Sequence, residues 1–148
     1  MSFSLIAFDL DGTLVDSRRD LSESANELLA ECGADPLPEA TVTPMVGNGA
    51  PALVARAFAA SGIEPPADAV PRFVAIYARR LLNHTRAYPR IDEVLDALGA
   101  RASLAVLTNK PLAATRSILE GLNLARHFAA EAILGGDGPL PRKPDPTG

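Results

Sequence analysis

The sequence has 148 residues, of which 47% are hydrophobic and 22% are charged, and its formal net charge is −4. This length supports one substantial hydrophobic core but not two large domains. Aromatic residues make up 5% of the chain and no block of lysine or arginine occurs, which argues against a base-stacking or phosphate-backbone interface with nucleic acid.

The first half of the chain combines one strand with several helices. Residues 4–10 (SLIAFDL) form a continuous apolar run, which predicts a strand buried on both faces of a parallel sheet. Apolar residues at helical spacing predict a helix over 20–32, one that starts at Pro51, and one after the Pro65-Pro66 pair. Residues 34–49 are rich in proline and glycine and should be mostly loop with one short helix. The residues expected to face inward are Leu21, Ala25, Leu28, Leu29, Cys32, Leu53, Val54, Ala57, Phe58, Val70, Phe73, Val74, Tyr77 and Leu81.

The second half alternates between strand and helix. We predict a short helix over 91–99, a strand over 103–107 (SLAVL), a helix that begins at Pro111 and a third short strand over 130–136. Such alternation is typical of βαβ units. The chain is therefore predicted to be an α/β protein with a discontinuous core, residues 1–15 and 87–148, and a helical insert over residues 16–86.

Two carboxylates follow the first predicted strand in FDLDGT. Side chains two residues apart on a strand share a face, so Asp9 and Asp11 lie on one side while Leu10 points into the core. Two negative charges this close repel unless a cation or hydrogen bonds compensate, and Mg²⁺ prefers oxygen ligands of this kind. Gly12 can adopt a positive φ and let backbone N–H groups approach an anion. The segment predicts a site for Mg²⁺ and a phosphate.

Polar residues also follow the next two predicted strands. Thr108 in LTNK is placed to hydrogen-bond a phosphate oxygen, and the helix that begins at Pro111 adds a favourable dipole. Lys143 in LPRKPDP lies between prolines, so its ammonium can be aimed at a dianion or at a carboxylate. Ligands of open α/β sheets bind at the carboxyl ends of the strands. The three strand ends together predict a site for a small phosphorylated metabolite.

The remaining polar residues are expected to be structural. His84 and His127 have no partner at a suggestive spacing, which indicates surface or helix-end positions. Asp16 and Asp137 are expected at a helix start and in a turn. The single cysteine, Cys32, fits a reducing compartment, and neither a signal peptide nor an apolar run of membrane-spanning length is visible. We therefore expect a cytoplasmic protein without a membrane partner.

The three strand-end motifs resemble those of a known superfamily. DLDGTLVDS, LTNK and RKPDP, in this order, resemble motifs one to three of the haloacid dehalogenase superfamily of phosphatases. The stretches VGNGAPALV (46–54), TRAYPRI (85–91) and GGDGPLPRKPDP (135–146) are similar to phosphoglycolate phosphatases. The resemblance implies a Rossmann-like parallel sheet and implies that the insert is the helical cap of this superfamily.

The resemblance also implies a role for each motif residue. Asp9 would attack phosphorus to form an aspartyl-phosphate, and Asp11 would protonate the leaving oxygen and later take a proton from water. The Asp9 carboxylate and the backbone carbonyl of Asp11 would hold Mg²⁺. Thr108 and Lys143 would bind the phosphoryl group. The implied substrate-binding residues are Gly12, Thr13 and Asn109 in the core and Gly47, Asn48 and Gly49 in the cap.

The superfamily has a fourth motif, a later strand that ends in acidic residues and completes the magnesium site. No such strand follows Lys143. We therefore expect the chain to correspond to the first two-thirds of an enzyme, with its C-terminal strands missing, and to be weakly active or inactive at this length. The first strand would then be an exposed apolar edge, which favours edge-strand association, although the oligomeric state itself is not predicted.

The leading functional prediction is Mg²⁺-dependent hydrolysis of 2-phosphoglycolate. Other sugar-phosphate phosphatases, phosphosugar mutases and pyrophosphatases are alternatives, because substrate choice depends on details of the cap. A non-catalytic phosphate-binding, metal-binding or interaction fragment is an alternative from a different class. Dehalogenation uses the same nucleophile on carbon, and the DGT signature and the metal-suited carboxylate pair weigh against it.

Overall fold

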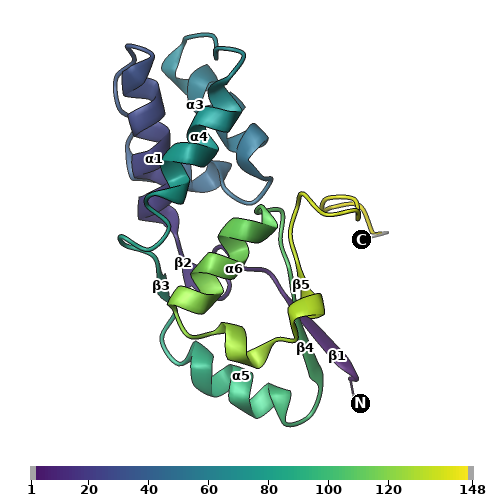
Figure 1. Cartoon of the computed structure of the whole chain (residues 1–148). Coiled ribbons are helices and arrows are strands. Elements are labelled where there is room, and N and C mark those ends of the chain that lie inside the picture. Colours follow the sequence, from purple (N-terminus) through teal and green to yellow (C-terminus); the bar gives the residue numbers. More distant parts are fainter. Residues whose placement is uncertain (1–2, 147–148) are drawn as a thin grey trace. The chain divides into compact units, whose positions relative to one another are not determined.

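The computed structural model describes residues 3–146 and divides the chain into two compact units (Figure 1). The first unit contains the residues up to Asp16 and those from Arg86 onward. The second unit is the continuous segment Ser17–Thr85. The chain thus leaves the first unit after Asp16 and returns to it at Arg86.

A parallel sheet with two crossover helices forms the centre of the first unit. Its elements are β1 (Leu5–Phe8), α5 (Ile91–Gly99), β4 (Ser103–Leu107), α6 (Leu112–Gly121) and β5 (Ile133–Leu134). The strand order is β1-β4-β5, with Leu5 opposite Ser103 and Phe8 opposite Val106. Helix α5 packs against β4 and α6 packs against β5. The prediction of an α/β fold with a parallel sheet is confirmed.

The place of β1 in the sheet differs from the expectation of a strand buried on both faces. β1 lies at one edge of the sheet, where it pairs with β4. Leu5 is 57% exposed, whereas Val106 in the central strand β4 is fully buried. The prediction of two-sided burial is wrong for β1, because a continuous apolar run does not show which neighbours cover the strand. The expectation of an exposed apolar edge is confirmed for the described residues.

A second, two-stranded sheet closes the discontinuous unit and was not predicted. Strands β2 (Val15–Asp16) and β3 (Arg86–Ala87) pair antiparallel, and the backbone N–H of Tyr88 donates to the carbonyl of Leu14 at 3.1 Å. The pair joins the outgoing and the returning segment of the first unit. Strands of two residues are too short to show any periodicity.

The third predicted strand is shorter than its sequence suggested. Of residues 130–136, Ile133–Leu134 form β5, and a 3₁₀ turn over Ala130–Ala132 precedes it. A second 3₁₀ turn, Ala125–His127, follows α6. Gly135 and Gly136 end the strand and begin the loop that carries Lys143.

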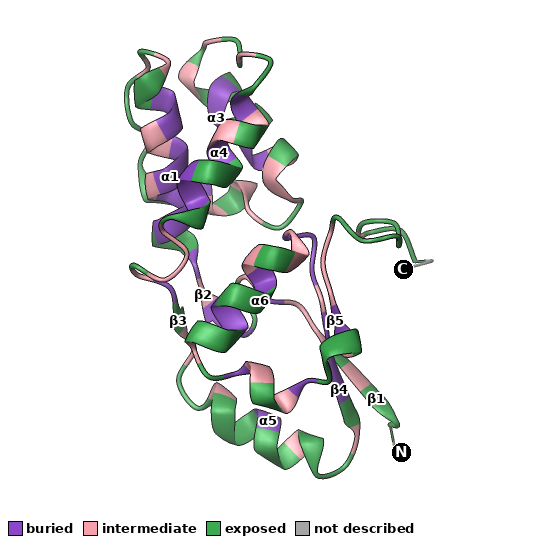
Figure 2. Cartoon of the chain, in the orientation of Figure 1, coloured by how far each residue is buried: buried purple, intermediate pink, exposed green. Residues whose placement is uncertain are grey.

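The second unit is helical throughout. Its elements are α1 (Arg18–Glu31), α2 (Glu39–Val42), the 3₁₀ turn η1 (Thr43–Met45), α3 (Ala50–Ser61) and α4 (Ala69–Ala78). Figure 2 shows the buried residues as stripes along α1, α3 and α4. The stripe of α1 consists of Leu21, Ala25, Leu28 and Leu29, and that of α3 of Leu53, Val54, Ala57 and Phe58, as predicted.

Three details of the helical prediction are wrong. Val74 is 40% exposed, and Ile76 takes its expected place beside Phe73 and Tyr77. Helix α3 starts at Ala50, one residue before Pro51. Cys32 is partly buried and follows the end of α1. Within the described residues, no helix is both long enough and apolar enough to span a bilayer.

Candidate active site

The turn after β1 presents two carboxylates from a tightly folded backbone. Leu10 between them is fully buried, and its carbonyl accepts the N–H groups of Leu14 at 2.9 Å and Val15 at 3.2 Å. Gly12 has a φ of +79°, a conformation that favours glycine, and its N–H donates to the carbonyl of Val15 at 2.9 Å. One Asp9 oxygen, Oδ1, accepts the N–H of Leu10 at 2.8 Å, so the Asp9 side chain is held against the turn.

Each carboxylate of the turn is paired with a lysine. Lys143 Nζ lies 3.0 Å from Asp9 Oδ1, and Lys110 Nζ lies 3.1 Å from Asp11 Oδ1. The sequence contains only these two lysines, and the rest of its 14 basic residues are arginines. Two ammonium groups therefore offset the two adjacent negative charges. From the sequence, Mg²⁺ was expected to supply this positive charge.

The segment after β4 supplies Thr108 and fixes Lys110. Thr108 is 4% exposed, and its hydroxyl oxygen accepts the Lys110 N–H at 3.1 Å. That oxygen is an acceptor in this bond, and no residue within 3–146 accepts a hydrogen bond from it, so its proton remains to be donated. The backbone N–H of Thr108 donates to the carbonyl of Leu134 at 3.1 Å, which ties the segment to β5.

Asn109 ties the segment after β4 to the loop that carries Lys143. Its side-chain amide donates to the Lys143 carbonyl at 3.1 Å, and the Lys143 N–H donates to its side-chain oxygen at 2.9 Å. The loop is therefore held by a side chain as well as by the stiffness of its prolines. Thr108, Asn109 and Lys143 all line one hollow of the first unit, whose lining does not include Asp9 or Asp11.

Two glycines allow these loops to approach each other. A Cβ on Gly135 would lie 2.4 Å from the backbone nitrogen of Leu112, and one on Gly136 would lie 2.2 Å from the carbonyl oxygen of Asn109. Asp137 accepts the Leu112 N–H at 2.8 Å at the start of α6. The turn residue expected at position 137 thus also satisfies a backbone donor in the first turn of α6.

The predicted cap residues lie in the second unit. Gly47 and Gly49 both have positive φ, and Gly49 immediately precedes α3. The side-chain oxygen of Asn48 accepts a hydrogen bond from Arg56 at 3.0 Å, and the same guanidinium nitrogen donates to the Met45 carbonyl at 3.1 Å. Arg56 therefore shapes this loop. The contribution of these three residues to substrate binding stays a prediction.

The donor set of the first unit fits a magnesium ion at Asp9. The Asp9 side chain is 36% exposed, and its Oδ2 has no hydrogen-bond or ion-pair partner among residues 3–146. An accessible carboxylate oxygen with a free lone pair is the type of ligand that Mg²⁺ prefers. The Asp11 side chain is 11% exposed and its Oδ1 is already paired with Lys110. Asp9 is therefore the better carboxylate ligand of the two.

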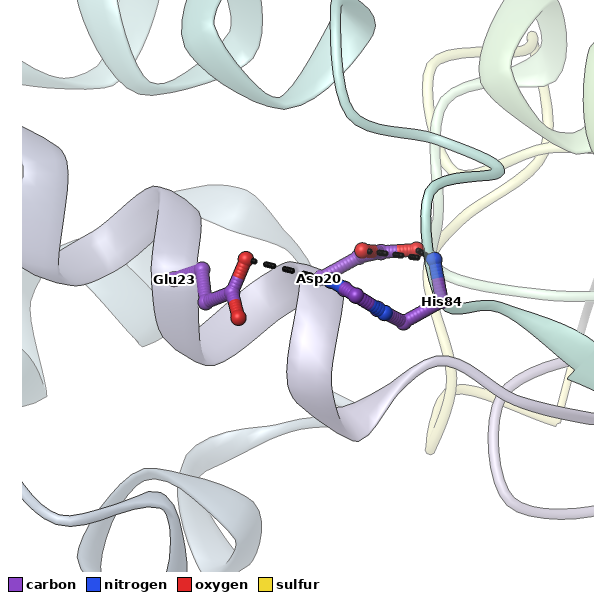
Figure 3. Close-up of side chains that lie close together, drawn as sticks. All are labelled: Asp20, Glu23 and His84. Atoms are coloured by element: carbon purple, nitrogen blue, oxygen red, sulfur yellow. Dashed lines mark hydrogen bonds and ion pairs between the residues drawn. The ribbon is translucent and has the colours of Figure 1, made fainter.

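A second group of potential metal ligands lies in the helical unit. Oxygen or nitrogen atoms of Asp20, Glu23 and His84 lie within 4.8 Å of one another (Figure 3). Asp20 is fully buried, and its Oδ2 accepts the N–H groups of His84 at 2.9 Å and Thr85 at 2.7 Å and the Thr85 hydroxyl at 2.7 Å. This carboxylate is saturated by hydrogen bonds from the chain. Its role is to fasten residues 84–85 to the start of α1.

Two surface clusters of charged residues have shifted pKa values. A hydrogen bond from Arg80 lowers the pKa of Glu27 and raises that of Arg80 on the surface formed by α1 and α4. In the first unit, a hydrogen bond with His127 lowers the pKa of Asp92. His127 Nε2 lies 2.8 Å from Asp92 Oδ1, so His127 has a partner that its sequence position did not reveal.

Known proteins are similar to this chain in sequence and in fold. A profile described as haloacid dehalogenase-like hydrolase matches residues 6–148. A protein of Rhodospirillum rubrum named phosphoglycolate phosphatase is 46% identical over 96% of this chain and 62% of its own length. One of Agrobacterium fabrum with the same name is 44% identical over 95% of this chain and 62% of its own.

A solved structure is similar over nearly the whole chain. The crystal structure of a predicted phosphoglycolate phosphatase from Haemophilus somnus superposes with a TM-score of 0.88 at 36% identity, covering 96% of this chain and 66% of the other. The chain thus spans 62% to 66% of the length of these relatives. Among the residues near the site, Lys110 was not predicted from the sequence. The available signal was that lysine occurs only at positions 110 and 143 of the sequence.

Proposed function

The chain belongs to the haloacid dehalogenase-like hydrolase family, and from this membership we propose that its first unit carries the phosphoryl-transfer site of a phosphomonoester hydrolase. The observation that carries the proposal is the state of Asp9. Its Oδ2 is unpartnered within the described residues, while Lys143 Nζ lies 3.0 Å from Oδ1. A carboxylate that is accessible at one oxygen and oriented at the other is suited to nucleophilic attack.

The proposed reaction proceeds in two steps at Asp9. In the first, the Asp9 carboxylate forms a bond to phosphorus while the ester oxygen leaves, and Asp11 delivers a proton to that oxygen. In the second, water attacks the phosphorus of the aspartyl-phosphate and gives its proton to Asp11, which releases phosphate and restores Asp9. The Lys143 ammonium and the Thr108 hydroxyl donate hydrogen bonds to the phosphoryl oxygens in both steps.

Magnesium is the proposed cofactor, held by the Asp9 carboxylate and by the backbone carbonyl of Asp11. When bound, the ion would supply positive charge to the phosphoryl oxygens as they are transferred. Backbone groups of Gly12 and Thr13, both exposed in the turn, would lie along the phosphoryl group.

The proposed substrate is 2-phosphoglycolate, a small phosphomonoester with a carboxylate. The names of the relatives at 46% and 44% identity support this choice. The second unit would act as the cap that selects the carboxylate end, through the loop of Gly47, Asn48 and Gly49. Residues that read the substrate in this way set specificity, whereas the chemistry resides in the first unit.

The decisive experiment compares the wild type with Asp9→Asn. The protein is mixed with a panel of labelled phosphomonoesters and magnesium, and the acid-stable phosphoenzyme and released phosphate are quantified. We expect both to appear with the wild type, slowly at this length and most rapidly with 2-phosphoglycolate, and to fall by at least about 10³-fold in Asp9→Asn. Asp35→Asn, which changes an exposed aspartate of the second unit, should behave as the wild type.

Two results would contradict the proposal in different ways. Fastest release from another ester would overturn the choice of 2-phosphoglycolate and leave the chemistry intact. A wild type that binds phosphate but forms no phosphoenzyme, with Asp9→Asn binding equally well, would favour a non-catalytic binding fragment instead.

A further inference from the structure

Lys110 has no part in the reaction as described, although it is one of only two lysines in the sequence. Its side chain is 4% exposed, and its ammonium lies 3.1 Å from Asp11 Oδ1. The side chain of the other lysine, Lys143, is 33% exposed beside Asp9. One ammonium is thus accessible to a ligand, whereas the other is enclosed and contacts the proposed proton-transfer residue.

The backbone of Lys110 is held on both sides. Its N–H donates to the Thr108 hydroxyl oxygen at 3.1 Å, and its carbonyl accepts the Gly136 N–H at 2.8 Å. Gly136 also lets the loop after β5 lie against the carbonyl of Asn109, the residue before Lys110. The side chain of Lys110 therefore reaches Asp11 from a backbone that is held in place. This arrangement is expected of a residue that orients a neighbouring carboxylate.

We propose, on the basis of the function proposed above, that Lys110 is a positioning residue for Asp11. Its ammonium, 3.1 Å from Oδ1, fixes the orientation in which the Asp11 carboxyl group gives a proton to the leaving oxygen and later takes one from water. The torsion that turns a carboxylate about its axis is broad, so an ion pair to one oxygen restricts the direction of the other. Lys110 keeps its own protons in both steps.

The choice of lysine at this position supports the same role. Arginine supplies every basic position of the sequence other than 110 and 143. A guanidinium forms bidentate pairs with carboxylates and would engage both oxygens of Asp11. An ammonium is a compact charge that can pair with one oxygen without forming the two parallel bonds of a guanidinium.

The test exploits the dependence of proton transfer on the leaving group. Single-turnover phosphorylation of the wild type and of Lys110→Met is measured with 2-phosphoglycolate, whose alkoxide needs a proton, and with p-nitrophenyl phosphate, whose phenolate does not. We expect Lys110→Met to lose about 10²- to 10³-fold with the alkyl ester and less than about 5-fold with the aryl ester. Lys143→Met, the matched control, should lose activity equally with both substrates.

A second set of variants covers the case in which Lys110→Met removes the positive charge beside the largely buried Asp11 carboxylate and the variant fails to fold. Asp11→Asn is compared with the double variant Asp11→Asn/Lys110→Met, which buries neither charge. If Lys110 acts through Asp11, the double variant should match Asp11→Asn with either ester to within about 2-fold. A further loss in the double variant would overturn the proposal, because it would mean that Lys110 contacts the phosphoryl group itself.

The outcomes separate this proposal from the one on which it rests. Equal losses in Lys110→Met with both esters, in a wild type that is phosphorylated on Asp9, would overturn the role of Lys110 alone. A wild type that is phosphorylated by neither ester would overturn the proposed function and the role of Lys110 with it.

Discussion

Asn109 and Lys143 exchange two hydrogen bonds across the gap between the β4 end and the loop after β5. The side-chain amide donates at 3.1 Å and the side-chain oxygen accepts at 2.9 Å, so both ends of one carboxamide are used on one backbone residue. Only asparagine or glutamine offers a donor and an acceptor in this arrangement. The lysine that faces Asp9 is thus held in place from the neighbouring strand.

Replacing Asn109 should therefore loosen Lys143. We expect Asn109→Ala to lower the free energy of unfolding by about 1–3 kcal/mol, since each hydrogen bond contributes about 0.5–1.5 kcal/mol. Phosphoenzyme formation should slow by about 10-fold, because the backbone that carries the Lys143 ammonium is no longer held by Asn109. Urea unfolding and single-turnover labelling would measure the two effects. An unchanged labelling rate in a destabilised variant would show that Asn109 is structural only.

Gly136→Ala should fail for a steric reason. The new Cβ would lie 2.2 Å from the Asn109 carbonyl oxygen, a contact with backbone that a side-chain rotation cannot relieve. We expect a loss of about 1–3 kcal/mol or more in thermal unfolding. Gly99→Ala is the control, because its Cβ would lie an ordinary 3.6 Å from the Leu104 side chain. Equal stability of the two variants would refute the close approach.

Asp20→Ala should destabilise the helical unit strongly. The fully buried carboxylate accepts hydrogen bonds from His84 and Thr85, and its removal takes these hydrogen bonds away from the start of α1. We expect a loss of about 3–5 kcal/mol, measured by circular dichroism during urea unfolding. Glu23→Gln should cost far less, because Glu23 is a partly exposed ion-pair residue. A wild type stabilised by added magnesium through this cluster would contradict the structural role.

Glu27 should contribute to stability only above its lowered pKa. The hydrogen bond from Arg80 lowers the pKa of Glu27 below its ordinary value of 4.5, so its contribution is complete above the unfolded value and is lost as the pH falls through the folded one. The two side chains are 30% and 29% exposed, so solvent limits the effect. We expect Glu27→Gln to cost up to about 1 kcal/mol at neutral pH.

That difference between Glu27→Gln and the wild type should vanish in acid. Denaturant midpoints measured as a function of pH would show convergence of the two curves as Glu27 becomes protonated. Glu64→Gln, at an exposed position that forms no ion pair with residues 3–146, is the matched control and should track the wild type at every pH. Parallel curves for Glu27→Gln and the wild type down to strongly acidic pH would contradict the assignment.

The exposed edge of β1 should promote association of the 148-residue chain. Phe3 precedes β1 and is 64% exposed, and Leu5 in β1 is 57% exposed. Within the described sheet, β1 pairs with β4 alone. A charge on an edge strand opposes pairing with another copy, so Leu5→Lys should reduce the oligomer fraction in sedimentation velocity. Val74→Lys adds the same charge at an exposed position of α4 and should not. An equal decrease of the oligomer fraction in both variants would show that the net charge of the chain, and not the edge of β1, controls association.

Local pattern was sufficient to identify the main elements of this protein. Apolar runs and helical stripes located β1, β4, α1 and α3, because burial in a sheet or along a helix imposes a period that the sequence itself displays. The carboxylates of Asp9 and Asp11 and the lysine at 143 were found in the same way. Each stands directly after a recognisable strand or in a distinctive proline-flanked motif.

Contacts between distant segments were decided only in three dimensions. The ion pair of Lys110 with Asp11, the exchange between Asn109 and Lys143, and the burial of Asp20 depend on which loops meet, and no period encodes that. The exposure of β1 depends likewise on its neighbours in the sheet. A sequence records what each residue prefers locally, whereas the partner that a charge or an amide finds is a property of the assembled fold.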